Sequence, residues 1–184
     1  MFYDMTSSTG RAAEHVEDTQ CARFIAFYEH TCARLIGQVA TMIGSRTDAE
    51  DIVQDAFVRC LSNWSKVRDY DNPEAWVRTV AFRLCTSRYR RTIVAARALP
   101  RLLAPTDTYP AESVEDRLDI EAALAKLDIF RRAVLILYYT EDLSIEEIAR
   151  TLNIRPGTVK SRLARARSQL QTLLSDDTGG KANE

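Results

Sequence analysis

Hydrophobic residues recur every three or four positions through most of this chain, and no stretch shows the sustained alternation typical of a strand. One series consists of Ile52, Phe57, Leu61 and Trp64. A second series consists of Trp76, Val80 and Leu84. This spacing places the apolar side chains of each series on one face of a helix. The sequence therefore predicts an all-α protein.

Polar and proline-containing stretches divide this pattern into seven predicted helices. They cover residues 18–43, 48–65, 73–91, 113–126, 128–140, 144–152 and 156–174. Prolines interrupt the stretch ARALPRLLAPTDTYPAE, and proline ends helices because it lacks the amide hydrogen. We therefore expect two small helical domains joined by a flexible linker. The predicted segments are a disordered N-terminus over 1–17, domains over 18–95 and 113–174, a linker over 96–112, and a disordered tail over 175–184.

The stretch LSIEEIARTLNIRPGTVKSRLARARSQL predicts a helix-turn-helix. Ser144 and Glu147 have the spacing of a capping box, which begins a helix. Asn153 suits the left-handed conformation of a tight turn, and Pro156 favours the first turn of the next helix. Two helices joined in this way place the second one where it can enter a DNA groove.

The second helix of this motif is basic on its expected outer face. Val159 and Leu163 should turn the opposite face toward the first helix. Lysine and arginine side chains on such a helix can donate to guanine O6 and N7 and to phosphates. A helical hairpin with a purely structural basic face is the alternative. The residues that we expect at the DNA are Thr158, Lys160, Ser161, Arg162 and Arg165.

Charge is segregated along the chain, although the formal net charge is only -1. Residues 83–101 carry six arginines and no acid, whereas residues 107–121 carry six acids and one arginine. Two basic segments separated by an acidic one favour two modules that face nucleic acid. Solvated helix faces would be the alternative for either basic segment alone.

Signals for other protein classes are weak. No apolar run reaches the roughly 20 residues of a membrane span, and the N-terminus lacks a secretory pattern, so we expect a cytoplasmic protein. The four cysteines form no CxxC pair; we expect buried or half-buried thiols, with a redox role as the alternative. No glycine-rich phosphate loop, catalytic constellation or metal-ligand cluster stands out. We therefore expect no cofactor, no metal and no enzymatic activity.

Two parts of the sequence resemble a known family. DAEDIVQDAFVRCLSNW and NPEAWVRTVAFRLCTSRYRR resemble regions 2.1 to 2.4 of the bacterial sigma-70 family, in its extracytoplasmic-function (ECF, group 4) class. The helix-turn-helix is similar to region 4.2 of that class. The resemblance covers roughly residues 20–95 and 113–174, in the family's order. It implies an RNA polymerase sigma factor that recognises −10 and −35 promoter elements and helps to melt the −10 region.

The same resemblance implies a site for core RNA polymerase. The helix within DAEDIVQDAF has an acidic, partly apolar face, which suits a protein partner better than DNA. By resemblance it binds the β′ clamp helices, with Asp51, Gln54 and Asp55 as the central polar contacts. Acids that stabilise a helix N-terminus are the alternative for Asp48 and Glu50. Further implied partners are the β flap, promoter DNA and an anti-sigma factor, without direct contact to a membrane.

A polar loop, KVRDYDN, precedes a helix on which we expect an exposed basic face. Such a groove can track a separated strand and hold a flipped base. By resemblance it binds the −10 element. Trp64 and Trp76 lie on the apolar stripe, so we expect core packing rather than base stacking. The candidate −10 residues are Lys66, Arg68, Asn72, Arg78, Arg83, Arg88, Arg90 and Arg91.

The sequence departs from the family pattern at three points. Arg83 replaces the usual asparagine and Ser87 the usual aspartate, which leaves the −10 preference open. The usual start of region 4.1 is missing, and Asp128 is expected to cap the helix there. Two other classes would fit part of the chain: an autonomous helix-turn-helix repressor and a helical adaptor that binds only proteins. Neither explains both halves.

Overall fold

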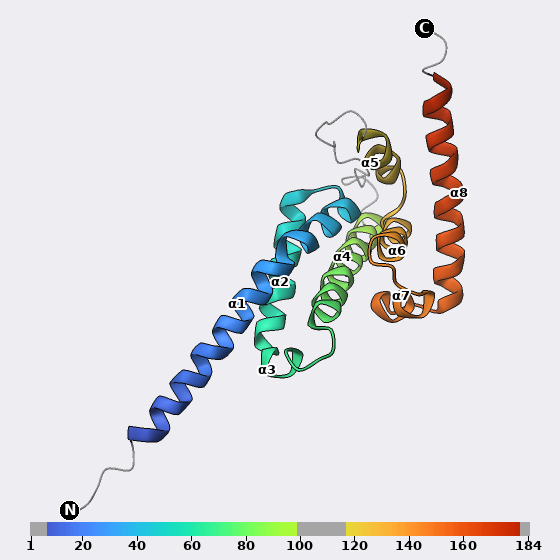
Figure 1. Ribbon diagram of the computed structural model, residues 1–184. Coiled ribbons are helices and arrows are strands. Elements are labelled where there is room, and N and C mark those ends of the chain that lie inside the picture. The colour runs from blue at the N-terminus through green and yellow to red at the C-terminus, as the bar shows by residue number, and fades with distance from the viewer. Residues whose placement is uncertain (1–6, 99–116, 181–184) are drawn as a thin grey trace, which may run out of the picture.

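The computed structural model describes residues 7–98 and 117–180, and every regular element in these two ranges is a helix (Figure 1). This confirms the all-α prediction. The helices are α1 (Ser7–Ile43), α2 (Arg46–Ser62), α3 (Trp64–Val67), α4 (Pro73–Ala98), α5 (Arg117–Ala125), α6 (Ile129–Tyr139), α7 (Ile145–Leu152) and α8 (Pro156–Gly180). Most of the predicted linker, from residue 99 onward, lies outside the described residues.

Helices α1, α2 and α4 form the N-terminal core. Val39, Val53 and Phe82, one from each helix, are completely buried. The Ser45 side chain caps α2 by accepting from the Asp48 amide at 3.3 Å. Asn72 caps α4 in the same way, accepting from the Ala75 amide at 2.8 Å. Polar residues thus begin helices α2 and α4, and apolar faces hold the three helices together.

Helices α6, α7 and α8 form the C-terminal core, with α5 packed against α8. Leu137, Ile148 and Val159 are buried where the three helices meet. The Asp128 side chain accepts from the amides of Phe130 and Arg131, both at 3.0 Å. The prediction that Asp128 caps this helix is therefore confirmed.

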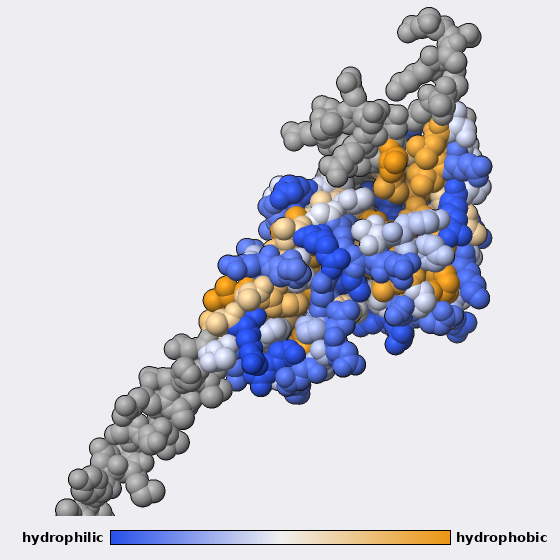
Figure 2. Space-filling model, in the orientation of Figure 1, coloured by the Kyte–Doolittle hydropathy of each residue, from blue (hydrophilic) through white to orange (hydrophobic). Residues whose placement is uncertain are grey.

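The two halves pack against each other through their central helices. Helix α4 contacts both α6 and α7, and α1 contacts α6 (Figure 1). The rings of Tyr89 and Phe130 lie 5.8 Å apart across this boundary, edge to face. The helix expected at the −10 element therefore lies beside the helix-turn-helix. Figure 2 shows a largely hydrophilic face, with apolar side chains gathered beside the upper part of α8.

Several helices run beyond their predicted ends. Helix α1 begins at Ser7 and α8 continues to Gly180, so the prediction of disorder is corrected for 7–17 and 175–180. Helix α4 continues to Ala98, and the predicted helix 48–65 ends at Ser62 before the short α3. Adding residues to an existing helix costs far less than starting one. The predicted boundaries were drawn from apolar faces that pack against other helices. They therefore missed terminal turns that extend a helix beyond its packed part.

The sequence analysis expected the tryptophans and the cysteines to lie in or beside the core. The structure contradicts this prediction at one cysteine. Trp64 is buried, donates from Nε1 to the Gln20 carbonyl at 3.2 Å and stacks on Phe27; Trp76 is half-buried against the same core. The positions of the thiols are as follows: Cys60 and Cys85 are buried, Cys32 is half-buried and Cys21 is exposed. The prediction is therefore wrong for Cys21. Burial raises the pKa of Cys60 to about 11 and the pKa of Cys85 to about 12, which disfavours reactive thiolates there.

Candidate nucleic-acid interface

The helix-turn-helix has the predicted local geometry. The Ser144 hydroxyl accepts from the Glu147 amide at 3.3 Å, while the Glu147 carboxylate accepts from the Ser144 amide at 2.8 Å. The Ser144 hydroxyl also donates to the Glu147 carboxylate at 2.6 Å, and this bond, together with the one from the Ser144 amide, keeps the pKa of Glu147 below its ordinary value. Asn153 ends α7 in the left-handed region, with φ of 52°. The capping box and the turn are both confirmed.

Helix α8 turns its apolar side inward and much of its polar side outward. Val159 and Leu163 are buried against α6 and α7, whereas Lys160 and Arg165 are exposed. Ser161 is also exposed, and its hydroxyl donates to the Thr158 carbonyl at 3.1 Å. Thr158 itself is half-buried near the start of the helix. An exposed basic strip therefore begins close to the N-terminus of α8.

Arg162 differs from its neighbours on this helix. Its guanidinium lies 4.9 Å from the centre of the Phe130 ring, and the side chain is half-buried. Burial lowers the pKa of Arg162 below its ordinary value. Arg90 of α4 lies over the same ring at 5.4 Å. The expected solvent position of Arg162 is therefore corrected, because helical spacing cannot reveal an aromatic ring supplied by α6.

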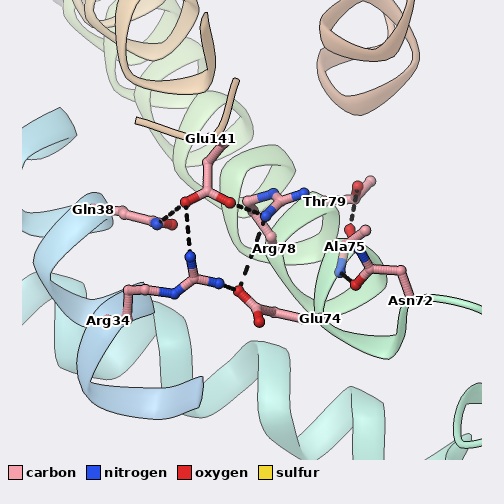
Figure 3. Close-up of polar contacts among 8 residues, drawn as sticks. All are labelled: Arg34, Gln38, Asn72, Glu74, Ala75, Arg78, Thr79 and Glu141. Atoms are coloured by element: carbon pink, nitrogen blue, oxygen red, sulfur yellow. Dashed lines mark hydrogen bonds and ion pairs between the residues drawn. The ribbon is translucent and has the colours of Figure 1, made fainter. Parts of the chain in front are cut away.

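The expected exposed face of α4 is also corrected, most clearly at Arg78. This side chain is buried, with 6% of the residue exposed. It forms ion pairs with Glu141, in the loop before α7, and with Glu74 at 4.0 Å (Figure 3). Burial lowers the pKa of Arg78, and the negative charge of Glu141 opposes this effect. The carboxylate that holds Arg78 comes from the other half of the chain, which is why the α4 sequence gave no sign of it.

The remaining −10 candidates lie in three kinds of surroundings. Lys66, Arg90 and Arg91 are exposed. Arg83 is exposed but donates to two carbonyls of α7, and Arg88 pairs with Asp55 at 2.6 Å. The structure does not bring the eight candidates together as one open groove.

The two loop candidates are partly committed to neighbouring residues. The Asn72 side chain caps α4. Arg68 is half-buried and pairs with Asp69 at 3.5 Å. The atom that makes this pair is the buried Nε, which forms no hydrogen bond within the described part of the chain. Lys66, which the sequence analysis placed in this loop, instead lies in the short helix α3 and is exposed.

The acidic face of α2 continues into an apolar one. Asp51, Gln54 and Asp55 are exposed, as expected for a contact with a protein. Val58 and Leu61 follow on the same side of the helix, 62% and 55% exposed. The sequence analysis placed Leu61 in the same apolar series as Ile52, which predicts a buried side chain, and that prediction is wrong. Its helical position, about half a turn from the buried Ile52, was the signal that could have found this patch.

Two other kinds of site find no support in the described residues. No group of three or more histidine, cysteine, aspartate or glutamate side chains there could hold a metal ion. None of the helices described is both long enough and apolar enough to cross a membrane.

Comparison with known families matches both halves of the chain. The model described as Sigma-70 region 2 matches residues 27–92, and the model described as Sigma-70, region 4 matches residues 117–170. The two matched segments fall within the two domains predicted from the sequence. They include the acidic face of α2, the basic helix α4 and the helix-turn-helix.

Related proteins and structures agree with this match. The RNA polymerase sigma-E factor of Streptomyces avermitilis is 33% identical over 158 residues, covering 82% of this chain and 84% of the relative. The ECF RNA polymerase sigma factor SigM of Mycobacterium tuberculosis is 33% identical over 150 residues, covering 79% and 70%. The sigma factor RpoE from Bartonella quintana, solved with the anti-sigma factor NepR, has a similar fold, with a TM-score of 0.67 at 24% identity over 88% of this chain and 99% of that one.

A further solved structure, CnrH in complex with the cytosolic domain of CnrY, has a TM-score of 0.50 at 26% identity, covering 84% of this chain and 88% of that one. None of these findings favours an autonomous repressor. The two matched regions follow each other in the order that the sequence analysis expected. The relatives that match most of the chain are themselves RNA polymerase sigma factors. The protein therefore belongs to the sigma-70 family, as an RNA polymerase sigma factor of the ECF class.

Proposed function

We propose that this sigma factor uses three separate surfaces: α2 for core RNA polymerase, α4 with its preceding loop for the −10 element, and α8 for the −35 element. The observation that carries the proposal is the exposed basic strip of α8, held outward by a capped helix-turn-helix. A helix presented in this way fits a major groove. The protein then acts as a dissociable specificity subunit, while the chemistry of RNA synthesis belongs to the polymerase.

At the −35 element, Lys160, Ser161 and Arg165 are the residues that reach base edges and phosphates. All three are exposed. Thr158 lies near the N-terminus of α8, where the helix dipole favours a phosphate. Arg162 contacts DNA only if it leaves the ring of Phe130.

At the −10 element, exposed Lys66, Arg90 and Arg91 supply the first attraction to the separated strand. Arg88 joins them when it exchanges Asp55 for a phosphate. Arg78 and Arg83 reach DNA only after the C-terminal half has moved away from α4. Asn72 and Arg68 shape the loop.

Core polymerase is the proposed partner of α2. Asp51, Gln54 and Asp55 give polar anchors, and Val58 with Leu61 gives an apolar area beside them. Mixed polar and apolar character is typical of protein interfaces and unlike a surface that binds DNA. By family resemblance the partner is the pair of β′ clamp helices, and the C-terminal half contacts the β flap.

The partners of the solved neighbours support one further proposal. RpoE and CnrH were each solved in complex with another protein, described for RpoE as an anti-sigma factor. We propose that an anti-sigma factor also controls this chain. The protein then works in the cytoplasm, where polymerase and chromosomal DNA are found.

The decisive experiment is run-off transcription with purified core RNA polymerase on sheared genomic DNA. With the protein present, new transcripts should begin at discrete sites that share upstream elements. Mapping their 5′ ends would also give the promoter sequence. A folded chain that produces no new start would overturn the proposal.

A pair of variants assigns the polymerase surface. Asp51→Ala combined with Asp55→Ala should weaken binding to core polymerase while leaving the helical content unchanged, because both side chains are exposed. Glu50→Ala is the control, since Glu50 lies on the same helix and pairs locally with Arg46 at 3.0 Å. Normal holoenzyme assembly by the double variant would contradict the assignment to α2.

A further inference from the structure

A pocket of about 310 Å³ lies between α4 and α7. Its volume is at the lower end of the range of small-molecule sites, which is about 300–1,000 Å³. Arg78 and Arg83 line it from α4, and Arg150 lines it from the last turn of α7. Glu147, also on α7, is the one acid among the described residues of its wall. The pocket is therefore lined by more cations than anions.

Arg78 belongs to a local network that is neutral as a whole. Its guanidinium pairs with Glu141 and Glu74, and Arg34 pairs with the same two carboxylates (Figure 3). Two arginines thus face two glutamates. Because buried charges are stabilised by such pairing, Arg78 is already compensated. The charge balance of the pocket depends on the other charged residues of its wall.

Arg83 and Arg150 have no such counter-ion. Arg83 donates from Nε to the Thr151 carbonyl at 2.9 Å and from a terminal nitrogen to the Arg150 carbonyl at 2.6 Å. Carbonyl groups carry no net charge, so these bonds leave Arg83 cationic. The exposed side chain of Arg150 forms no hydrogen bond or ion pair with a residue that the structure describes. The family resemblance places asparagine at position 83, so one of these two cations departs from the family pattern.

Glu147 cancels only one of these two charges. Its Oε2 accepts from the Ser144 hydroxyl at 2.6 Å and from the Ser144 amide at 2.8 Å, which favours the ionised carboxylate. Two arginines and one glutamate leave one positive charge in excess. A phosphate monoester carries a charge of about −1.5 to −2 at pH 7, and its oxygens accept two parallel hydrogen bonds from a guanidinium. A phosphate group therefore suits both the charge and the donors of this wall.

We propose that the pocket between α4 and α7 is a binding site for a small molecule that carries a phosphate group, with Arg83 and Arg150 as its principal donors. Arg150 supplies an unused guanidinium from α7. Arg83 supplies its second terminal nitrogen from α4, which donates to no residue that the structure describes. The site lies on the free chain and requires neither polymerase nor promoter DNA, so it goes beyond the proposed function.

Three variants of the full-length chain test the site. Arg150→Gln removes the pocket cation that has no assignment to DNA. Ala75→Leu keeps every arginine and fills part of the pocket, because Ala75 lines it from α4. Arg59→Gln is the matched control, since Arg59 is an exposed arginine of α2 outside the pocket and its loss changes the net charge equally. Far-UV circular dichroism establishes that each variant is folded.

The probe is inorganic phosphate, titrated into the ¹⁵N-labelled protein and followed by the amide signals in NMR spectra. Sodium chloride at matched ionic strength is the reference. Amide signals of α4 and α7 beside the pocket should shift and saturate with phosphate, but not with chloride. The dissociation constant should rise about tenfold or more in Arg150→Gln, as typical for the loss of a hydrogen bond to a charged group. Ala75→Leu should show a similar loss, and Arg59→Gln should bind as tightly as the wild type.

Adenosine monophosphate, titrated in the same way, distinguishes two sources of the phosphate group. An affinity equal to that of inorganic phosphate would support a site for the phosphate group alone. Tighter binding that is also lost in Ala75→Leu would support a site for a nucleotide.

Three results would overturn the proposal. Equal weakening in Arg150→Gln and Arg59→Gln, or shifts that do not saturate, would mean diffuse attraction between charges. Unchanged binding by Ala75→Leu would place the phosphate outside the pocket. A single-stranded oligonucleotide that loses as much affinity in Ala75→Leu as phosphate does would make the pocket part of the path of DNA. Run-off transcription decides the proposed function separately, because phosphate binding is measured on the free chain.

Discussion

Helices α4 and α8 both carry several arginines, but they present them differently. On α8, Arg165 is exposed together with Lys160. On α4, Arg78 is buried against Glu141, and Arg83 is bound to the end of α7. The difference depends on what the other half of the chain places beside each helix. A count of arginines along a helix therefore does not identify a DNA-binding face; the neighbouring carboxylates and carbonyls must be known.

The two helices also differ in how they are held. Helix α7, which supports α8, begins at a local capping box and ends at a left-handed residue. Helix α4 has an Asn72 cap, but contacts with distant residues fix its position. We expect substitutions in the α4 core to cost more stability than substitutions in the α7 caps.

Phe82→Ala should cause the largest loss, about 3–5 kcal/mol in the free energy of unfolding. Phe82 is completely buried on α4, so the substitution leaves a cavity where three helices meet. Urea unfolding followed by circular dichroism measures the change. Val94→Ala on the same helix is the control, because Val94 is 65% exposed. If both substitutions cost the same, α4 would not depend on its buried core.

Arg165→Ala should reduce discrimination at one −35 base pair by about 1–3 kcal/mol while leaving folding unchanged. The side chain is exposed and its effect should be confined to DNA. Transcription from promoters with single −35 substitutions measures the change in preference. Arg162→Ala offers a comparison, because it should also lower stability by removing the contact with Phe130. Unaltered promoter preference in Arg165→Ala would contradict its assignment to base recognition.

Asn153→Ala should destabilise the C-terminal half by about 1–2 kcal/mol, because alanine is disfavoured in the left-handed region, whereas the short polar side chain of asparagine can hydrogen-bond locally there. The φ of 52° at Asn153 ends α7 and sets the entry to α8. Thermal unfolding gives the measurement. Asn153→Gly should be nearly neutral, since glycine adopts this conformation readily. Equal losses in both variants would mean that the asparagine side chain, rather than the backbone conformation, is important.

The parts of the molecule that sequence could predict are those with local causes. Ser144, Glu147, Asn153 and Asp128 act on amides or torsions within a few residues, and each was assigned correctly. Apolar spacing likewise placed Trp64 in the core. These signals determine where helices begin, end and turn. They were sufficient for the all-α fold and the helix-turn-helix.

The candidate site was less predictable, because its surroundings come from distant parts of the chain. Glu141 lies 63 residues from Arg78, and the carbonyl partners of Arg83 lie 67 and 68 residues away. Arg162 was misplaced because the ring of Phe130 comes from another helix. Leu61 was misplaced because an apolar residue was assigned to the core without regard to its helical angle. Packing between distant parts of the chain decides which charged side chains remain exposed to bind DNA. The spacing of residues along one helix does not show this packing.

Arg88→Ala should have the smallest effect on stability, less than about 1 kcal/mol, because its pair with Asp55 is exposed on both sides. The same substitution should change DNA binding more clearly than it changes stability. If Arg88 exchanges Asp55 for a −10 phosphate, the variant holoenzyme should lose about one unit from the slope of log K against log salt concentration. Filter binding to a mapped promoter over a range of salt measures that slope. An unchanged slope with slightly reduced stability would make Arg88 a structural partner of α2, and α4 would then offer DNA still fewer arginines than its sequence suggests.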